Sequence, residues 1–288
     1  MIPASFDYHA PRSLGEAVSL LSSLGSDARL LAGGHSLLPM MKLRFAQPAH
    51  LVDLNGIADL RGIREEGATL VVGAMTTEAE LLASPIVRNK VPLLAEGAAS
   101  IADPQVRNKG TVGGDISHGD PGNDHPALMM ALDAAFVLTG PKGQRTVKAD
   151  GYFLGLFSTQ LAPDEILTQI RIPIPPAGTG WSYQKLKRKT GDFATAASAV
   201  VLQMKGTAVA GVAIALTNVG ATALRARAAE AALIGKPINA ATLDEAARLA
   251  MSICEPTADQ RGDVAYKTAM CGEMTRRALQ AAAARARG

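Results

Sequence analysis

The spacing of hydrophobic positions near the start of the chain alternates between helix-like and strand-like. Ser13 stands three residues before Glu16 and ahead of apolar positions at helical spacing, which is typical of a helix start. Residues 29–32 and 50–54 each resemble a short strand, and a short helix is predicted between them at residues 36–44. These elements indicate a small parallel β-α-β unit, because parallel strands need a crossover connection.

From residue 56 onward the pattern is that of an α+β segment. Strands are predicted at residues 69–73, 135–139, 144–148 and 165–172, and helices at residues 78–82 and 93–101. The sequence Gly-Pro-Lys-Gly at residues 140–143 predicts a hairpin turn. Between these elements we expect a long glycine-rich loop over residues 103–123.

A domain boundary is predicted at residues 175–180, where two prolines and two glycines stop regular structure. Beyond it, strands are predicted at residues 181–187, 196–204 and 208–217, and alanine-rich helices at residues 223–234, 241–253 and from residue 263 to the C-terminus. This order predicts a small antiparallel sheet covered by a helical layer. We therefore divide the chain into three units, at residues 1–55, 56–176 and 177–288.

The composition restricts the classes of function. A hydrophobic content of 48% and a charged content of 19% exclude a disordered chain. A net charge of +3 and an aromatic content of 4% argue against nucleic acid as a partner. The two cysteines, Cys254 and Cys271, exclude a disulfide scaffold, a structural zinc cluster and an iron–sulfur cluster held by this chain alone.

The start of the chain has neither the basic region nor the apolar region of a secretory signal. The longest apolar stretches fall short of the roughly 20 residues that span a membrane. We therefore expect a soluble cytoplasmic protein.

Two glycine pairs occur in similar surroundings: Ala32-Gly33-Gly34-His35-Ser36 and Thr111-Val112-Gly113-Gly114-Asp115. Glycine adopts positive φ and has no side chain, so consecutive backbone N–H groups can converge on a phosphate oxygen. Two such loops brought together could hold the two phosphates of one pyrophosphate. A glycine pair is also an ordinary turn element, and neither the Gly-x-Gly-x-x-Gly nor the P-loop pattern is present. The spacing alone leaves both interpretations open.

Two other catalytic interpretations are rejected. His35, His118 and His125 lack the spacing and the accompanying ligands of a metal site. A hydrolase triad of Ser36, His35 and Asp53 is rejected because the Gly-x-Ser-x-Gly pattern is absent.

The residues around the glycine pairs resemble a known family. The matching segments are residues 31–44, residues 102–115, residues 119–128 (Gly-Asp-Pro-Gly-Asn-Asp-His-Pro-Ala-Leu) and residues 183–196. In this order they resemble the FAD-binding medium subunits of the molybdenum hydroxylases (xanthine dehydrogenase family), and among these most nearly the medium subunits of aerobic carbon monoxide dehydrogenases. The resemblance implies a vanillyl-alcohol-oxidase/PCMH-type FAD-binding fold of two subdomains, followed by a C-terminal antiparallel sheet with three helices.

The resemblance also implies which residues bind the cofactor. The pyrophosphate would be cradled by two loops, Ala32, Gly33, Gly34, His35 and Ser36 in the first and Thr111, Val112, Gly113, Gly114 and Asp115 in the second. Ile101 and Ala102 would line the ribityl or isoalloxazine region, and Asp124 would bond the flavin end. Lys185 would approach FAD from the third unit, and Phe193 would meet the isoalloxazine ring. The resemblance implies no catalytic residue and no metal ligand on this chain.

Two of these positions carry alternatives. Asp115 stands where many relatives have asparagine, and a carboxylate beside a diphosphate is unfavourable unless it points away or meets a basic neighbour. Either its backbone does the binding, or the second loop is slightly rearranged. The charge run at residues 185–189 is usually a solvated surface. Here it also suits a phosphate or flavin contact, which we favour for Lys185, or a docking patch for an acidic partner.

By resemblance, the chain would be the FAD-binding electron-transfer subunit of a molybdenum-containing carbon monoxide dehydrogenase. It would take electrons from partner [2Fe-2S] clusters and pass them to a quinone or respiratory acceptor, while a partner subunit oxidises CO with water to CO2. The partners would be a large molybdopterin subunit and a small iron–sulfur subunit in a dimer of heterotrimers. Contact with the inner face of the cytoplasmic membrane would come through the acceptor.

Three alternatives stay open from the residues. The first is a medium subunit serving an N-heterocycle or aldehyde hydroxylase. The second is a free-standing FAD oxidase, and the third is a scaffold subunit without a cofactor.

Overall fold

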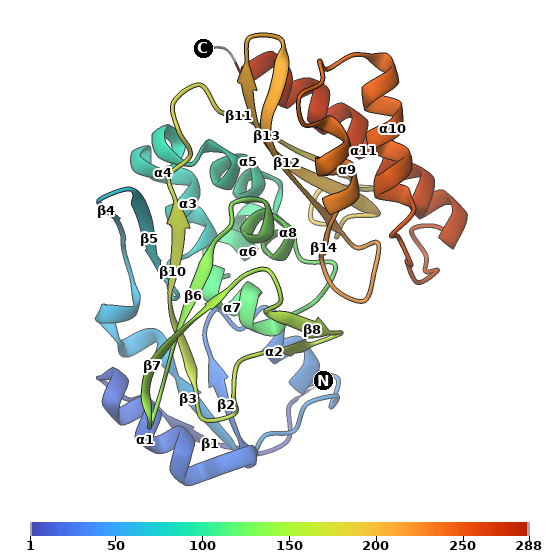
Figure 1. Cartoon of the computed structure of the whole chain (residues 1–288). Coiled ribbons are helices and arrows are strands. Elements are labelled where there is room, and N and C mark those ends of the chain that lie inside the picture. The colour runs from blue at the N-terminus through green and yellow to red at the C-terminus, as the bar shows by residue number, and fades with distance from the viewer. Residues whose placement is uncertain (1, 287–288) are drawn as a thin grey trace.

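The computed structural model describes residues 2–286, and its first unit is a small parallel sheet whose strands are connected by two helices (Figure 1). The elements are β1 (Asp7–His9), α1 (Leu14–Leu24), β2 (Ala28–Leu31), α2 (Leu37–Lys42) and β3 (His50–Asp53), with short 3-10 turns at Gly25–Asp27, Leu54–Gly56 and Ala58–Leu60. The strand order is β1-β3-β2, and both pairings are parallel. The predicted β-α-β unit is confirmed. Strand β1 was not predicted, since its three residues are largely exposed and show no apolar pattern.

The second unit is a five-stranded antiparallel sheet with the order β4-β5-β10-β6-β7. Its strands are β4 (Ile63–Glu66), β5 (Thr69–Gly73), β6 (Ala135–Gly140), β7 (Gly143–Lys148) and β10 (Ile166–Pro173), and β8 (Phe153–Gly155) and β9 (Ser158–Thr159) form a separate hairpin. The helices are α3 (Glu78–Ala83), α4 (Pro85–Lys90), α5 (Pro92–Ser100), α6 (Pro104–Arg107), α7 (Val112–His118) and α8 (Asp124–Ala131). The predicted hairpin between β6 and β7 is confirmed.

The predicted long loop at residues 103–123 is wrong, because it contains helices α6 and α7. Asp103 caps α6 through Val106 N–H, and Thr111 caps α7 through Gly114 N–H. Gly113 lies inside α7, and a Cβ at this position would come within 2.5 Å of the Ala74 Cβ. Glycine at this position therefore allows the helix to pack closely against the end of β5. From the sequence alone, such a glycine cannot be distinguished from one that forms a turn.

The third unit is a four-stranded antiparallel sheet, β11-β12-β13-β14, covered by three helices (Figure 1). The strands are β11 (Gly180–Leu186), β12 (Ala196–Lys205), β13 (Ala208–Thr217) and β14 (Leu224–Arg225), and the helices are α9 (Arg227–Leu233), α10 (Ala240–Met251) and α11 (Val264–Arg285). The predicted sheet with a helical layer is confirmed, although the predicted helix at residues 223–234 begins later because Leu224 and Arg225 pair with β13. The predicted last helix extends into residues 287–288, which lie outside the described residues.

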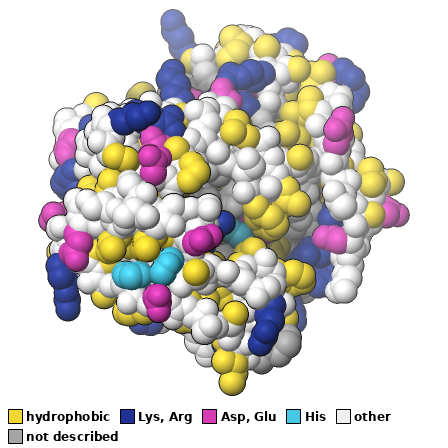
Figure 2. Space-filling view, turned by 90° about the horizontal axis from the view of Figure 1, so that it is seen from below, with side chains coloured by type: hydrophobic (Ala, Val, Ile, Leu, Met, Phe, Trp, Pro, Cys, Tyr) yellow, Lys and Arg dark blue, Asp and Glu magenta, His cyan; other side chains and the backbone are white. Residues whose placement is uncertain are grey.

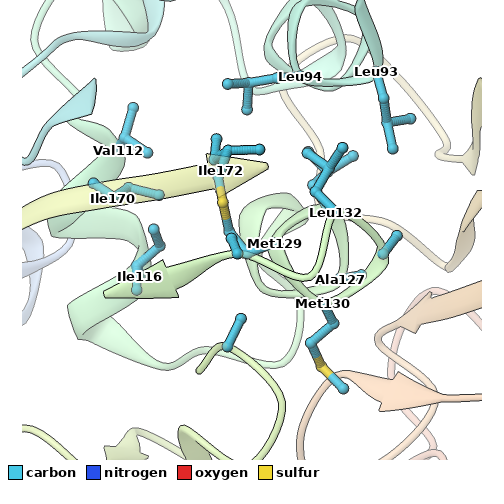
Figure 3. Packing of buried hydrophobic residues seen from close by; sticks show 14 of the residues in the cluster. Leu93, Leu94, Val112, Ile116, Ala127, Met129, Met130, Leu132, Ile170 and Ile172 are labelled. Carbon is cyan, nitrogen blue, oxygen red and sulfur yellow. The ribbon is translucent and has the colours of Figure 1, made fainter. Parts of the chain in front are cut away.

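One hydrophobic core joins the second and third units. Helix α8 is buried along its whole length, and Figure 3 shows Ala127, Met129 and Met130 of this helix in the same packing as Leu94 and Ile170. The core also includes Tyr183, Ala197, Ala199 and Ala215 from the third sheet. Burial of each large side chain contributes about 1.5–3 kcal/mol, so this shared core holds the third unit firmly on the second. Among the described residues, no helix is both long and apolar enough to cross a membrane.

The sheets occupy residues 7–53, 63–173 and 180–225. The exact domain boundaries given above remain predictions.

Candidate functional site

The two glycine segments lie against each other, as the sequence predicted. A Cβ on Gly33 would overlap the carbonyl oxygen of Lys109, just before the second segment. A Cβ on Gly114 would lie 3.5 Å from the Ala32 Cβ in the first segment. The first and second units thus meet through backbone that only glycine allows to approach so closely.

A cavity of about 770 Å³ opens where these two segments meet the third unit. This volume lies in the upper part of the range of small-molecule and cofactor sites. All of the predicted cofactor-binding residues except Val112 line it: Ala32, Gly33, Gly34, His35, Ser36, Ile101, Ala102, Thr111, Gly113, Gly114, Asp115, Asp124, Lys185 and Phe193. Three units of the chain therefore bring residues more than 150 positions apart to a single cavity.

The first glycine segment has the geometry of an anion-binding nest. Gly34 has a φ of 74°, and the turn leads directly into α2. Within residues 2–286, the amide N–H groups of Gly33, Gly34, His35 and Ser36 donate no hydrogen bond. Consecutive N–H groups without partners at a cavity wall are suited to the oxygens of a phosphate.

The second glycine segment is built differently from the first. Its amides are already used: Val112 N–H donates to Thr76 O at 3.0 Å, Gly113 N–H to Ala74 O at 2.9 Å and Gly114 N–H to Thr111 Oγ1 at 3.1 Å. The Val112 side chain is fully buried in the core instead of on the cavity wall. This segment supplies a closely packed wall, because its backbone groups stabilise the first turn of α7.

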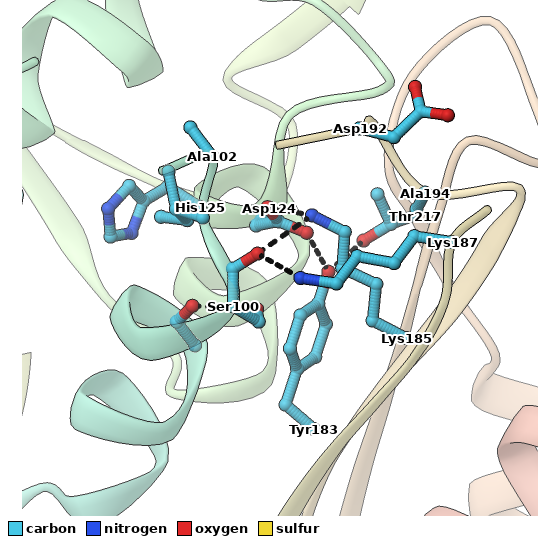
Figure 4. Close-up of polar contacts among 12 residues, drawn as sticks. Ser100, Ala102, Asp124, His125, Tyr183, Lys185, Lys187, Asp192, Ala194 and Thr217 are labelled. Atoms are coloured by element: carbon cyan, nitrogen blue, oxygen red, sulfur yellow. Dashed lines mark hydrogen bonds and ion pairs between the residues drawn. The ribbon is translucent and has the colours of Figure 1, made fainter. Parts of the chain in front are cut away.

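A buried ion pair also lines the cavity (Figure 4). Lys185 Nζ lies 2.7 Å from Asp124 Oδ2, and both side chains are almost fully buried. The Tyr183 hydroxyl donates to Asp124 Oδ1 at 2.5 Å, and Lys185 also donates to Ser100 O at 3.3 Å. Burial and the Asp124 charge raise the pKa of Tyr183 well above its usual value, so its hydroxyl remains protonated.

The charge run at residues 185–189 is therefore only partly a solvated surface. Lys187 Nζ donates to Ser100 O at 3.1 Å beside Lys185, and burial lowers the pKa of Lys187. Arg188 turns to the other side and pairs with Asp192.

The loop that carries Phe193 covers the cavity from the third unit. The Phe193 ring is 46% exposed, and the guanidinium of Arg261 lies 5.6 Å from its centre. Hydrogen bonds from Arg261 and Arg188 lower the pKa of Asp192 to about 2, so this loop is held by ionised partners. Ala102, with a φ of 42°, contributes to the wall facing the same end of the cavity.

A buried acid–base pair that the sequence analysis missed lies behind the cavity wall. His125 Nε2 lies 2.8 Å from Glu78 Oε2, both side chains are buried, and Glu78 lines the cavity. Burial disfavours the charged ring, but the Glu78 carboxylate outweighs it and raises the pKa of His125 to about 9. The position of His125 in the first turn of α8 depends on tertiary packing, and no local sequence signal identifies Glu78 as its partner.

The side chain of Asp115 neither points away from the cavity nor, among the described residues, forms an ion pair with a basic neighbour. It lines the cavity, and its Oδ1 atom is buried without a hydrogen-bond partner. Burial is the main cause that raises its pKa, to about 8, with further contributions from Glu78, Asp124 and Asp120 that outweigh the opposing effect of His125. At neutral pH the side chain is therefore an uncharged carboxylic acid.

Exposed hydrophobic side chains gather near the cavity. Leu154, Leu156 and Phe157 belong to the β8–β9 hairpin, which lines the cavity through Phe157, while Leu43 and Phe45 follow α2. Figure 2 shows hydrophobic side chains around a hollow on the lower face of the molecule. We call these five exposed residues the apolar rim. Large exposed apolar side chains are suited to contacts with other molecules.

Family models match both parts of the chain. Residues 4–175 match the FAD binding domain in molybdopterin dehydrogenase, and residues 181–282 match the CO dehydrogenase flavoprotein C-terminal domain.

Individual relatives are similar along nearly the whole chain. The carbon monoxide dehydrogenase medium chain of Hydrogenophaga pseudoflava is 62% identical over 99% of both chains. A solved structure of the carbon monoxide dehydrogenase from Hydrogenophaga pseudoflava, which lacks the Mo-pyranopterin moiety of the molybdenum cofactor, matches with a TM-score of 0.98 and 64% identity, covering 99% of both chains. Quinoline 2-oxidoreductase from Pseudomonas putida 86 matches with a TM-score of 0.95 at 36% identity, again covering 99% of both chains.

Proposed function

The chain belongs to the family of FAD-binding medium subunits of molybdopterin dehydrogenases, and we propose that it is the FAD-binding electron-transfer subunit of a molybdenum-containing carbon monoxide dehydrogenase. The observation that carries the proposal is the cavity itself. Its wall carries both unpartnered backbone amides and a buried Lys185–Asp124 pair, in a chain 62% identical to a carbon monoxide dehydrogenase medium chain.

The residues present fit a dinucleotide. The free N–H groups of residues 33–36 would hold the diphosphate, and the absence of side chains at Gly33 and Gly114 leaves the two backbone segments in contact. Lys185 and Asp124 would lie at the flavin end, with Phe193 over the ring. FAD, when bound, supplies the chemistry of accepting electrons and passing them onward.

The residues of this chain would bind and orient the cofactor. Lys185 places a positive charge at the flavin end, and Asp124 fixes that charge in a buried site where it acts strongly. Tyr183 holds the second carboxylate oxygen, so the orientation of Asp124 is set from the third unit. We propose that the CO chemistry takes place on a partner subunit.

The chain would work in a complex with a large molybdopterin subunit and a small [2Fe-2S] subunit, arranged as a dimer of heterotrimers. Two observations support partners: the apolar rim at the cavity, and a content of two cysteines, too few for an iron–sulfur relay on this chain. We propose that the complex is cytoplasmic and meets the inner face of the cytoplasmic membrane through its quinone or respiratory acceptor.

The test is the absorbance spectrum of the purified complex, recorded before and after CO is added under anaerobic conditions. We expect flavin and iron–sulfur bands together, and bleaching of both by CO. A complex bleached by an N-heterocycle or an aldehyde, and not by CO, would assign the chain to another molybdenum hydroxylase. An isolated chain whose flavin is bleached by a substrate without partners would make it an oxidase, and a colourless complex would make it a scaffold.

A further inference from the structure

We infer that Asp115 acts as a neutral carboxylic acid that donates its proton in a hydrogen bond to an anionic oxygen of the bound dinucleotide's diphosphate. Retention of the cofactor would then be coupled to the protonation of this one side chain. The inference rests on the proposed function, because it takes the cavity as the FAD site.

The position of Asp115 carries the first step. It directly follows Gly114, whose Cβ position lies 3.5 Å from Ala32, so its side chain belongs to the wall next to the free amides of residues 33–36. It also lines the cavity. The amides of residues 33–36 and Asp115 line the same cavity, so one dinucleotide in this cavity can contact both.

The surroundings of Asp115 carry the second step. Its Oδ1 atom is buried and, among residues 2–286, has no hydrogen-bond partner. A buried polar oxygen without a partner is costly unless a ligand or another group satisfies it. Ionisation of Asp115 would therefore leave a carboxylate oxygen buried without a partner, which favours the protonated form, while the residue's remaining exposed surface, at the cavity, leaves its other oxygen open to the ligand.

The charges around Asp115 decide its protonation state. Glu78 faces it from α3, Asp124 and His125 from α8, Asp120 from the loop before α8 and Tyr183 from β11. The positive charge of His125 is shared with Glu78 at 2.8 Å, and that of Lys185 with Asp124 at 2.7 Å. Among residues 2–286 no basic side chain forms a salt bridge with Asp115, and burial together with the charges of Glu78, Asp124 and Asp120 outweighs the opposing charge of His125, so the neutral acid is favoured.

The protonation state of Asp115 decides whether this wall repels or binds a diphosphate. An ionised Asp115 would repel the anion, whereas the protonated acid donates a hydrogen bond to it. The negative ligand in turn holds the proton on Asp115 more firmly, because a nearby like charge raises the pKa of a carboxyl group. FAD affinity should therefore be constant below about pH 8, the pKa of Asp115 in the ligand-free protein, and fall above it.

The test uses the complex from which FAD has been removed, titrated with FAD between pH 6.5 and pH 9.5 and followed by flavin fluorescence. For the native complex we expect the dissociation constant to rise about tenfold per pH unit above the transition. Asp115→Asn, which always carries a donor, should bind within about threefold of the native affinity at pH 6.5 and lose the part of the pH dependence due to Asp115. Asp115→Ala should bind more weakly at neutral pH and show the same flattened profile. The exposed Asp59→Asn is the matched control and should keep the native profile.

Calorimetry in buffers of different ionisation enthalpy gives an independent readout. At pH 8.5 the native complex should take up more protons on binding FAD than the Asp115→Asn complex does. A native profile that is flat to pH 9.5, or an Asp115→Asn variant with the native slope and native proton uptake, would overturn the inference while leaving FAD binding intact. Failure of the native complex to bind FAD at any pH would instead overturn the proposed function.

Discussion

The ammonium group of Lys185 lies 2.7 Å from Oδ2 of Asp124, and this pair joins strand β11 of the third unit to the first turn of helix α8. Both side chains are almost fully buried at the cavity wall. The contact therefore orders the flavin end of the site and also stabilises the attachment of the third unit.

The Lys185–Asp124 pair should be far more important for stability than a surface pair. Lys185→Met leaves the Asp124 carboxylate buried without its cation, and we expect the free energy of unfolding to fall by about 3–5 kcal/mol. Lys90→Met, which removes the exposed partner of Glu65, should cost less than about 1 kcal/mol. Urea unfolding of the flavin-free chain measures both. Equal losses in the two variants would show that burial does not strengthen the Lys185 contact.

Valine at Gly33 should prevent retention of FAD. Its side chain would overlap the backbone at Lys109 and push apart the two glycine segments, so we expect flavin content to fall at least about tenfold while the helical circular dichroism stays largely intact. Gly114→Val, which meets Thr111 Oγ1 at 2.8 Å, should also reduce flavin content. Gly15→Val in α1 has no atom within 4 Å of the added Cβ and is the matched control. Native flavin content in Gly33→Val would contradict the role of this contact.

Phe193→Ala should alter the properties of the bound flavin more than its affinity. The ring is half-exposed and would contact the flavin, whereas the diphosphate would be held by the amides of residues 33–36. We expect a changed reduction potential or reoxidation rate with FAD affinity within about threefold of native. Spectroelectrochemistry and fluorescence titration measure the two quantities, with Phe45→Ala on the apolar rim as the control. An equal loss of affinity and an unchanged potential would place Phe193 away from the flavin.

The buried His125–Glu78 pair should make the flavin-free chain less stable at alkaline pH. The pKa of His125 is about 9 in the folded chain and about 6.5 when unfolded, so its contribution is complete below pH 6.5 and is lost as the pH rises through 9. We expect His125→Gln to lose on the order of 2–3 kcal/mol at pH 6.5 and clearly less at pH 9.5. The exposed His35→Gln variant should follow the native curve. Thermal and urea unfolding across this pH range provide the measurement, and parallel native and His125→Gln curves would refute the assignment.

Much of the fold was predictable from the sequence because its signals are local. Apolar periodicity located the strands and helices of all three units, as for β13, where the predicted and observed residues 208–217 coincide. The flanking motifs identified the family, and the two glycine pairs indicated where two backbone segments could approach each other. Local spacing and residue size were sufficient for these conclusions.

The tertiary structure decided what depends on distant partners. Strand β1 forms only by pairing with β3 about 40 residues away. Gly113 is part of a helix that packs closely against Ala74. Val112 belongs to the core, His125 becomes charged because of Glu78 on another helix, and Asp115 becomes neutral mainly because it is buried. A residue's burial and the charges around it arise only when the chain folds, so the sequence determined which groups were available, and packing determined their protonation and use.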